Sequence, residues 1–161
     1  MTNQSFQDDF INFIDNSYTP AHFIAIAREK LLKAGYTEVS EKSQNENTPN
    51  KFFIVRDHRA IVCVNRVNFD AGVVIGGHID SPVFKVTKNS KAFGNHCEFN
   101  KVSRYGGQTS MTWMDRDLKI AGRVVIQKDG KLYAKTIQSE KAVCVIPSLA
   151  CHLISSGIQP N

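Results

Sequence analysis

The stretch VVIGGHIDSP, residues 73–82, joins an apolar run to two glycines and a His-x-Asp pair. The run at residues 72–76 is apolar on both faces, which predicts an interior strand of a sheet that is covered on both sides. Side chains alternate along an extended chain, so His78 and Asp80 are expected to lie on the same side, just past the strand. Open α/β sheets place their functional sites in that region.

Two interpretations of this stretch follow from its residues. A zinc-binding imidazole commonly donates its second ring N–H to a carboxylate, and Asp80 would serve His78 in this way. Gly76 and Gly77 would let the backbone approach a ligand closely. The other interpretation is structural, because an Asp before Ser-Pro is a common turn former. The stretch is therefore either a strand that ends in a turn or a strand that delivers a metal ligand.

The residues before this stretch predict two helices and a hairpin. Apolar residues recur at helical spacing over residues 4–15, which indicates an amphipathic helix. A second helix is expected to begin at Thr19–Pro20 and to stop at Gly35 in a left-handed conformation. Two β-rich runs within residues 51–66 then predict a hairpin. His22, in the first helical turn, and His58, in the hairpin turn, are interpreted as structural.

The residues after this stretch are mainly β-forming. Strand-like alternation continues over residues 83–88, and a polar, glycine-bearing segment of the kind seen in linkers and long β-connections follows. Asp129–Gly130 is a strong hairpin signal between two predicted strands. The predicted strands are 118–127, 131–138 and 141–147, and a short helix is expected at 147–154. The sequence thus predicts helices plus sheet over residues 1–88 and a mainly β unit over residues 89–161.

Composition excludes several protein classes. The chain has 161 residues, 42% hydrophobic and 22% charged, which is typical of a soluble globular protein. No apolar run approaches the roughly 20 residues of a bilayer span, and the first residues do not resemble a secretory signal, so a cytoplasmic protein is expected. The formal charge of +5 is spread along the chain, which argues against nucleic-acid binding. The four cysteines are expected to be reduced.

A wider set of motifs occurs in a fixed order along the chain. GGHIDSPVFKV is followed by YGG at 105–107, TWMDRDLKIAGRVV at 112–125 and IPSLACHL at 146–153. Together they resemble the aspartyl aminopeptidase family, and the N-terminal TPAHFIAIAREKLLKAGY is similar to that family's opening helix. The resemblance implies a co-catalytic zinc exopeptidase that removes N-terminal Asp or Glu from peptides, with two Zn²⁺ in each complete active site.

The resemblance also assigns roles to individual residues. His78 is similar to the family's first zinc ligand, and Asp80 to the carboxylate that orients it in the catalytic site. His152 matches a histidine that reaches into the neighbouring subunit's active site and binds substrate. From the residues alone, His152 beside Leu153 reads instead as a buried or interface histidine. His96–Cys97 is two adjacent residues, which do not supply a metal site.

Other positions are interpreted as structural or depart from the family pattern. Asp115, Arg116 and Asp117 are expected to form an ion-pair and turn network. Gln108 stands where a third glycine is usual in the family, and Ser148 replaces a common histidine.

The implied fold is the N-terminal part of a zinc-exopeptidase α/β sandwich with the start of an inserted mainly-β domain, which serves the family as lid and oligomerisation contact. A homo-oligomer is expected. The remaining ligands would come from sequence beyond these residues, so the chain is expected to be the front part of a longer protein. The alternative is a naturally truncated, non-catalytic relative that acts as an oligomerisation or interaction module.

Overall fold

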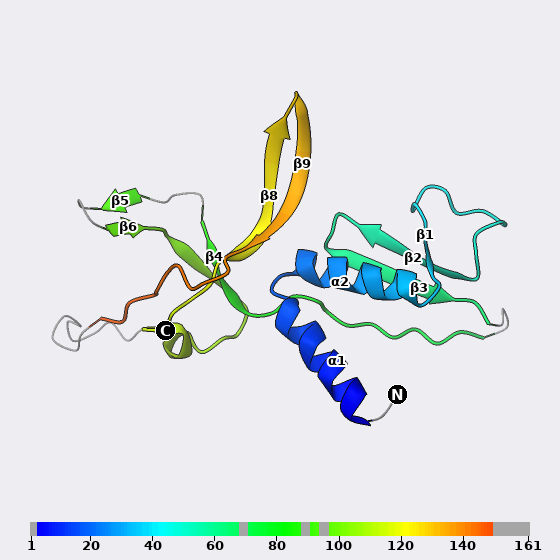
Figure 1. Cartoon of the computed structure of the whole chain (residues 1–161), viewed down its shortest axis with the longest axis horizontal. Helices are drawn as coiled ribbons and strands as arrows, with labels where there is room; N and C mark the ends of the chain where they lie inside the picture. The colour runs from blue at the N-terminus through cyan, green and yellow to red at the C-terminus, as the bar shows by residue number, and fades with distance from the viewer. Residues whose placement is uncertain (1–2, 68–70, 88–90, 94–96, 150–161) are drawn as a thin grey trace. The chain divides into compact units, whose positions relative to one another are not determined.

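The computed structural model describes residues 3–67, 71–87, 91–93 and 97–149, which form a mixed α/β structure (Figure 1). The chain divides into two compact units. One comprises Met1–Asp80 with Ala121–Gln138, and the other Ser81–Ile120 with Ser139–Asn161. The sequence-based division at residue 88 stays a prediction. Neither helix among the described residues has the length and apolar character that a membrane crossing requires.

Two helices open the first unit, as the sequence predicts. Helix α1 spans Asn3–Asn16 and helix α2 spans Pro20–Lys33. Thr19 adopts an extended conformation and its side chain accepts a hydrogen bond from the backbone N–H of His22, which caps α2. Gly35 follows the helix with φ of +81°, the left-handed conformation that glycine adopts without strain.

A three-stranded sheet follows the helices. Strand β2 (Lys51–Arg56) lies between β1 (Thr37–Glu38), which is parallel to it, and β3 (Ala60–Asn65), which is antiparallel, so the predicted hairpin is confirmed. Helix α2 packs along this sheet and contacts β1 and β3 (Figure 1). The buried hydrophobic residues among those described are Ala21, Ile24, Phe52 and Phe53.

A second hairpin belongs to the same unit, although about forty residues of the other unit separate it in sequence from residue 80. Strands β8 (Ala121–Lys128) and β9 (Lys131–Gln138) pair along their whole length. Asp129 and Gly130 join them with φ of 51° and 72°, the left-handed pair that a two-residue hairpin turn requires. The predicted hairpin is confirmed, but every residue of β9 is exposed.

The second unit consists of short paired strands. Strand β4 (Val83–Val86) pairs antiparallel with β7 (Val102–Tyr105), and β5 (Lys91–Phe93) pairs with β6 (Cys97–Phe99). A single 3₁₀ turn, η1, spans Ser110–Trp113, and its Trp113 ring meets Phe84 edge-on at 5.6 Å. The polar segment after residue 88, typical of linkers and long β-connections, thus contains strands of three or four residues, too short for an alternation pattern to show.

Two predicted strands are wrong as stated. Residues 72–76 form no strand; Val73, Val74 and Ile75 are 90%, 96% and 93% exposed, because no strand among the described residues lies alongside to pair with them. The segment 141–147 forms only two isolated bridges, from Cys144 to Leu118 and from Ile146 to Met114. Between these bridges Asp115 has φ of 55°, which breaks the extended geometry that a continuous ladder needs.

Two remaining sequence predictions concern the helix near the C-terminus and the thiols. Residues 147–149 are not helical, and the rest of the predicted helix at 147–154 lies outside the described residues. Cys63 and Cys144 are unbonded and exposed, so they do not pack as small hydrophobic residues, and the reduced state of the four cysteines stays a prediction.

Candidate functional site

The structure brings His78 and Asp80 together. Nδ1 of His78 lies 2.8 Å from the backbone oxygen of Asp80 and 3.3 Å from its carboxylate Oδ1. A carbonyl oxygen only accepts hydrogen bonds, so Nδ1 carries the proton and donates it. In the neutral imidazole this leaves Nε2 as the lone-pair nitrogen, and the His78 side chain is 83% exposed. The geometry therefore presents Nε2 to a ligand.

The local sequence explains this arrangement. Residues 71–82 have no regular secondary structure, so the contact is set by the two-residue spacing and not by a strand. After Asp80 the chain passes through Ser81, which the following proline restricts to extended conformations. Pro82 is packed against Gly106, where an added Cβ would lie 3.0 Å from the proline Cβ. Gly106 also has φ of +89°, so two independent constraints require glycine there.

His78 and Asp80 alone do not make a zinc site. Zinc in proteins takes three or four side-chain ligands, usually His, Cys, Asp or Glu. Among the residues that the structure describes, no group of three or more such side chains could hold a metal ion. His78 thus fits a zinc ligand oriented by Asp80, and the described part of the chain does not complete a site around it. His152 and His96, also considered from the sequence, lie outside the described residues.

The other described histidines occupy structural positions. The ring Nδ1 of His22 lies 2.8 Å from the hydroxyl of Thr19, and its ring meets Tyr18 edge-on at 5.6 Å. Partial burial lowers the pKa of His22 below its ordinary value of 6.5. His58 sits in the β2–β3 turn with φ of 54°. Both positions agree with the structural interpretation made from the sequence.

The carboxylate of Asp115 fastens two segments of the second unit. It accepts hydrogen bonds from the backbone N–H of Ser148 at 3.0 Å and from the Ser148 hydroxyl at 2.5 Å. These bonds lower the pKa of Asp115, because they favour its ionised form. The predicted turn at Asp115 is present, and Ser148 takes the place of the predicted ion pair. Sequence reasoning missed this contact because nothing links residues 33 apart.

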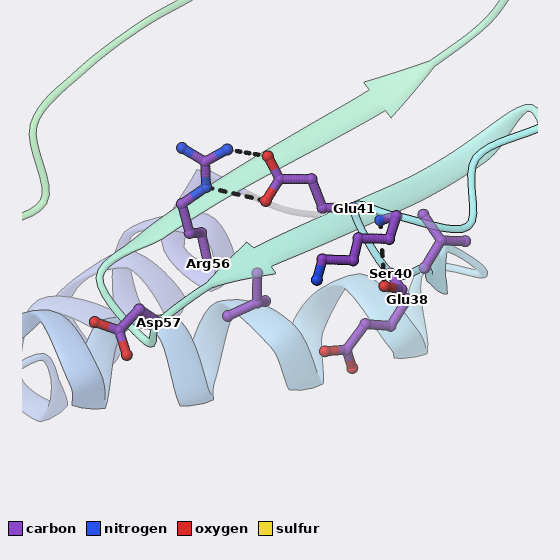
Figure 2. A pocket seen from close by; sticks show the side chains of 8 residues that line it. Glu38, Ser40, Glu41, Arg56 and Asp57 are labelled. Atoms are coloured by element: carbon purple, nitrogen blue, oxygen red, sulfur yellow. Dashed lines mark hydrogen bonds and ion pairs between the residues drawn. The ribbon is translucent and has the colours of Figure 1, made fainter.

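A pocket of about 550 Å³ lies in the first unit, and His78 is not among its lining residues (Figure 2). Two lining residues pair with each other, because the Arg56 guanidinium donates to the Glu41 carboxylate through two nitrogen atoms. A third, Glu38, pairs with Arg28 of α2 outside the lining, at 2.5 Å between Nε and Oε2. The lining residues are Glu38, Val39, Ser40, Glu41, Lys42, Val55, Arg56 and Asp57. Because these contacts tie the loop to the sheet, we interpret the pocket as structural.

Comparison with known proteins places this geometry in context. Residues 13–159 match the family described as aminopeptidase I zinc metalloprotease (M18). The chain is 35% identical over 150 residues to the aspartyl aminopeptidase of Caenorhabditis elegans. The alignment covers 90% of this chain and 32% of that protein. It is 34% identical over 158 residues to the aspartyl aminopeptidase of Aspergillus oryzae, and this alignment covers 90% of this chain and 31% of that protein.

Solved structures of aminopeptidases also match this chain over most of its length. Yeast aminopeptidase 1 superposes with a TM-score of 0.77 at 30% identity, over 90% of this chain and 36% of that one. The S. cerevisiae mApe1 dodecamer superposes with a TM-score of 0.78 at 29% identity, over 92% of this chain and 37% of that one. The chain therefore spans about a third of the length of the relatives it matches.

Proposed function

The chain belongs to the M18 family of aminopeptidase I zinc metalloproteases, and we propose that it forms part of an enzyme that releases N-terminal Asp or Glu from peptides. The observation that carries this proposal is the contact between His78 Nδ1 and Asp80, which lies inside the matched region. Relatives named aspartyl aminopeptidase support the acidic specificity. Because the chain spans a third of their length, the activity belongs to the complete protein.

In this proposal each residue has a distinct task. His78 provides Nε2 to Zn²⁺, and Asp80 fixes the ring orientation and raises the basicity of that nitrogen. Bound zinc would polarise the scissile carbonyl and lower the pKa of the attacking water. His152 would contact the substrate of a neighbouring subunit. The bridging carboxylate, the other ligands, the second Zn²⁺ and the base that activates the water would come from outside the described residues.

The proposal extends to assembly and location. We assign residues 1–88 to the catalytic α/β sandwich and residues 89–161 to the inserted β domain that serves as lid and oligomer contact. A homo-oligomer is supported by the dodecamer of the S. cerevisiae neighbour. We place the protein in the cytoplasm, with peptides as substrates and neither nucleic acid nor membrane as partner.

One observation favours a second candidate function. The described residues offer a single metal ligand with its orienting carboxylate, and no cluster of three donors. A chain of this kind acting alone would serve as an oligomerisation or interaction module beside catalytic M18 subunits. The two candidates differ in whether the native protein hydrolyses peptides by itself.

Native protein purified from its source cells tests the proposal. Its intact mass is compared with 18.0 kDa, and hydrolysis is measured on peptides that begin with Asp, Glu or Leu, with and without a chelator. We expect a species heavier than 18.0 kDa that cleaves the Asp and Glu peptides at least about tenfold faster than the Leu peptide and is inactivated by chelation. Activity that survives chelation, or that prefers Leu, contradicts the proposal.

Two histidine variants provide the matched control. His78→Ala removes the ligand, and we expect hydrolysis and bound zinc both to fall by about 100-fold. His58→Ala alters an exposed turn histidine of the same unit and leaves both quantities unchanged. Equal losses in the two variants would show that His78 acts through the fold and not through the metal.

A further inference from the structure

The turn of the β8–β9 hairpin contains a reactive pair of residues. Asp129 and Gly130 form its two-residue loop, where the two strands meet in Figure 1, and both are exposed. Asp129 is the one aspartate of the sequence that precedes a glycine. An aspartate carboxyl can close a five-membered ring onto the next backbone nitrogen, and glycine hinders that approach least because it has no Cβ. The pair is therefore suited to a reaction of the chain with itself.

Both reacting groups are free in the structure. No hydrogen bond or ion pair engages the Asp129 carboxylate among the described residues. The N–H of Gly130 takes part in none of the backbone hydrogen bonds that the described turns and loops form. A Cβ added at Gly130 would meet nothing within 4 Å, so the space beside the loop is open. Neither reacting group has to give up another contact first.

The folded hairpin is the remaining obstacle to this reaction. Positive φ values of 51° and 72° at Asp129 and Gly130 hold the loop in one conformation, and the pairing of Lys128 with Lys131 closes it. Ring closure requires the loop to leave this conformation, because the Gly130 nitrogen must turn toward Cγ of Asp129. Every residue of β9 is exposed, and an uncovered two-stranded hairpin is only marginally stable in water. Local opening therefore gives the reaction its access.

The turn of the β2–β3 hairpin lacks these features. Asp57 also has a positive φ and is exposed, but it precedes His58, whose Cβ hinders the approach. Its carboxylate lies 3.5 Å from Nη1 of Arg123 and 4.0 Å from Nε of Arg59. Helix α2 contacts β3, so this hairpin opens less readily. Asp57 is thus a matched comparison within the same unit.

We propose that Asp129 converts spontaneously to isoaspartate, which makes the β8–β9 turn a site of slow covalent modification. The Gly130 nitrogen attacks Cγ of the protonated Asp129 carboxyl. A C–N bond forms, the carboxyl hydroxyl leaves with the amide proton as water, and a cyclic imide results. Water then adds to one imide carbonyl and breaks its bond to nitrogen. Attack at Cγ restores aspartate, whereas attack at the backbone carbonyl leaves a chain that runs through Cβ and Cγ of residue 129.

The conversion changes the loop and not only its side chain. The main chain gains one atom at residue 129, and the freed α-carboxylate becomes the new side group. Because the turn and its length set the register of a hairpin, the lengthened loop no longer fits the pairing of Lys128 with Lys131. We expect the β8–β9 ladder to weaken after conversion. Water is the sole co-reactant, so the inference holds whether or not the protein is a peptidase.

Ageing of the native protein tests the proposal. Protein purified from its source cells is kept at neutral pH and physiological temperature for several weeks, and isoaspartate is measured at each aspartate by peptide mapping with electron-transfer fragmentation. A peptide of residues 126–133, kept alongside, gives the rate in an open chain. We expect Asp129 to convert within about tenfold of the peptide rate and at least about tenfold faster than Asp57. A rate more than about tenfold below that of the peptide, or equal conversion at Asp57, overturns the proposal.

Two variants separate the turn reaction from general ageing. Asp129→Asn keeps a residue that tolerates the left-handed conformation and loses ammonia instead of water, so we expect conversion at least about tenfold faster. Asp129→Ser has no carboxyl to react, and its β8–β9 amides should keep their exchange rates on ageing, whereas those of the unchanged protein exchange faster as isoaspartate accumulates. Equal loss of protection in aged Asp129→Ser would show that the hairpin opens for another reason and overturns the link between conversion and pairing.

Discussion

The hairpins β2–β3 and β8–β9 both turn through residues with positive φ, but their strands are buried to different extents. Both turns contain two consecutive residues with positive φ, Asp57 and His58 in one and Asp129 and Gly130 in the other. Both hairpins pair without interruption over six or eight residues of each strand. Yet Phe53 of β2 is 0% exposed, whereas all of β9 is exposed.

The difference lies in what packs on each hairpin. Helix α2 contacts β1 and β3, so the β2–β3 hairpin is part of a layered structure with a small core (Figure 1). The β8–β9 hairpin has no such layer in its burial pattern. Turn chemistry therefore suffices to pair two strands, but burial requires a second element, and an isolated two-stranded hairpin is only marginally stable in water.

The largest expected effect comes from the covered hairpin. Phe53→Ala removes a fully buried ring, and such truncations lower the free energy of unfolding by about 3–5 kcal/mol. Val125→Ala in β8 removes a side chain that is 62% exposed and should change it by less than about 0.5 kcal/mol. Urea denaturation followed by circular dichroism measures both. Similar losses in the two variants would show that β8–β9 is covered after all.

The second effect concerns the turn of the uncovered hairpin. Gly130→Val places a β-branched residue at φ of 72°, which costs about 1–2 kcal/mol for a non-glycine residue. Because little else stabilises β8–β9, we expect its amides to exchange faster while those of β2–β3 keep their rates. Gly122→Ala is the control, since a Cβ there meets nothing within 4 Å and its φ is not left-handed. Slower exchange in β8–β9 after Gly130→Val would contradict the turn assignment.

The third effect is the loss of the N-terminal cap of α2, the helix that packs on the β2–β3 hairpin. Thr19→Ala removes the side-chain acceptor at the start of α2, which typically costs about 1 kcal/mol. Since α2 packs on β1 and β3, the melting temperature of the first unit's core should fall, and Thr19→Ser should restore it. Retention of stability in Thr19→Ala would mean that packing alone fixes the start of α2.

Features set by near neighbours in sequence could be predicted. The cap at Thr19, the left-handed Gly35 and the Asp129–Gly130 turn depend on residues within a few positions, and all three are present. The meeting of His78 with Asp80 was likewise predicted from their two-residue spacing. Membership of the M18 family was predicted from the order of the motifs, and the family match confirms it.

Features set by distant residues could not be predicted. The bonds from Ser148 to Asp115 join segments whose spacing carries no pattern, so the sequence shows this serine only as a departure from the family. The run 72–76 was predicted to be an interior strand because its residues favour one, but pairing depends on neighbours that the described residues do not contain. Propensity favours a strand at residues 72–76, but the structure has no strand there.

The smallest effect is a dependence of the covered region on pH through His22. Burial lowers the pKa of His22 in the folded chain below its ordinary value of 6.5, so the unfolded chain binds this proton first as the pH falls. The contribution of His22 to stability is complete above pH 6.5 and declines below it, until the pH has passed through the folded pKa.

Unfolding free energies measured from pH 7.5 to pH 5 should therefore decrease less steeply in His22→Gln than in the unchanged protein. A steeper decrease in His22→Gln would contradict this prediction. It would mean that the charged form of His22 stabilises the folded chain.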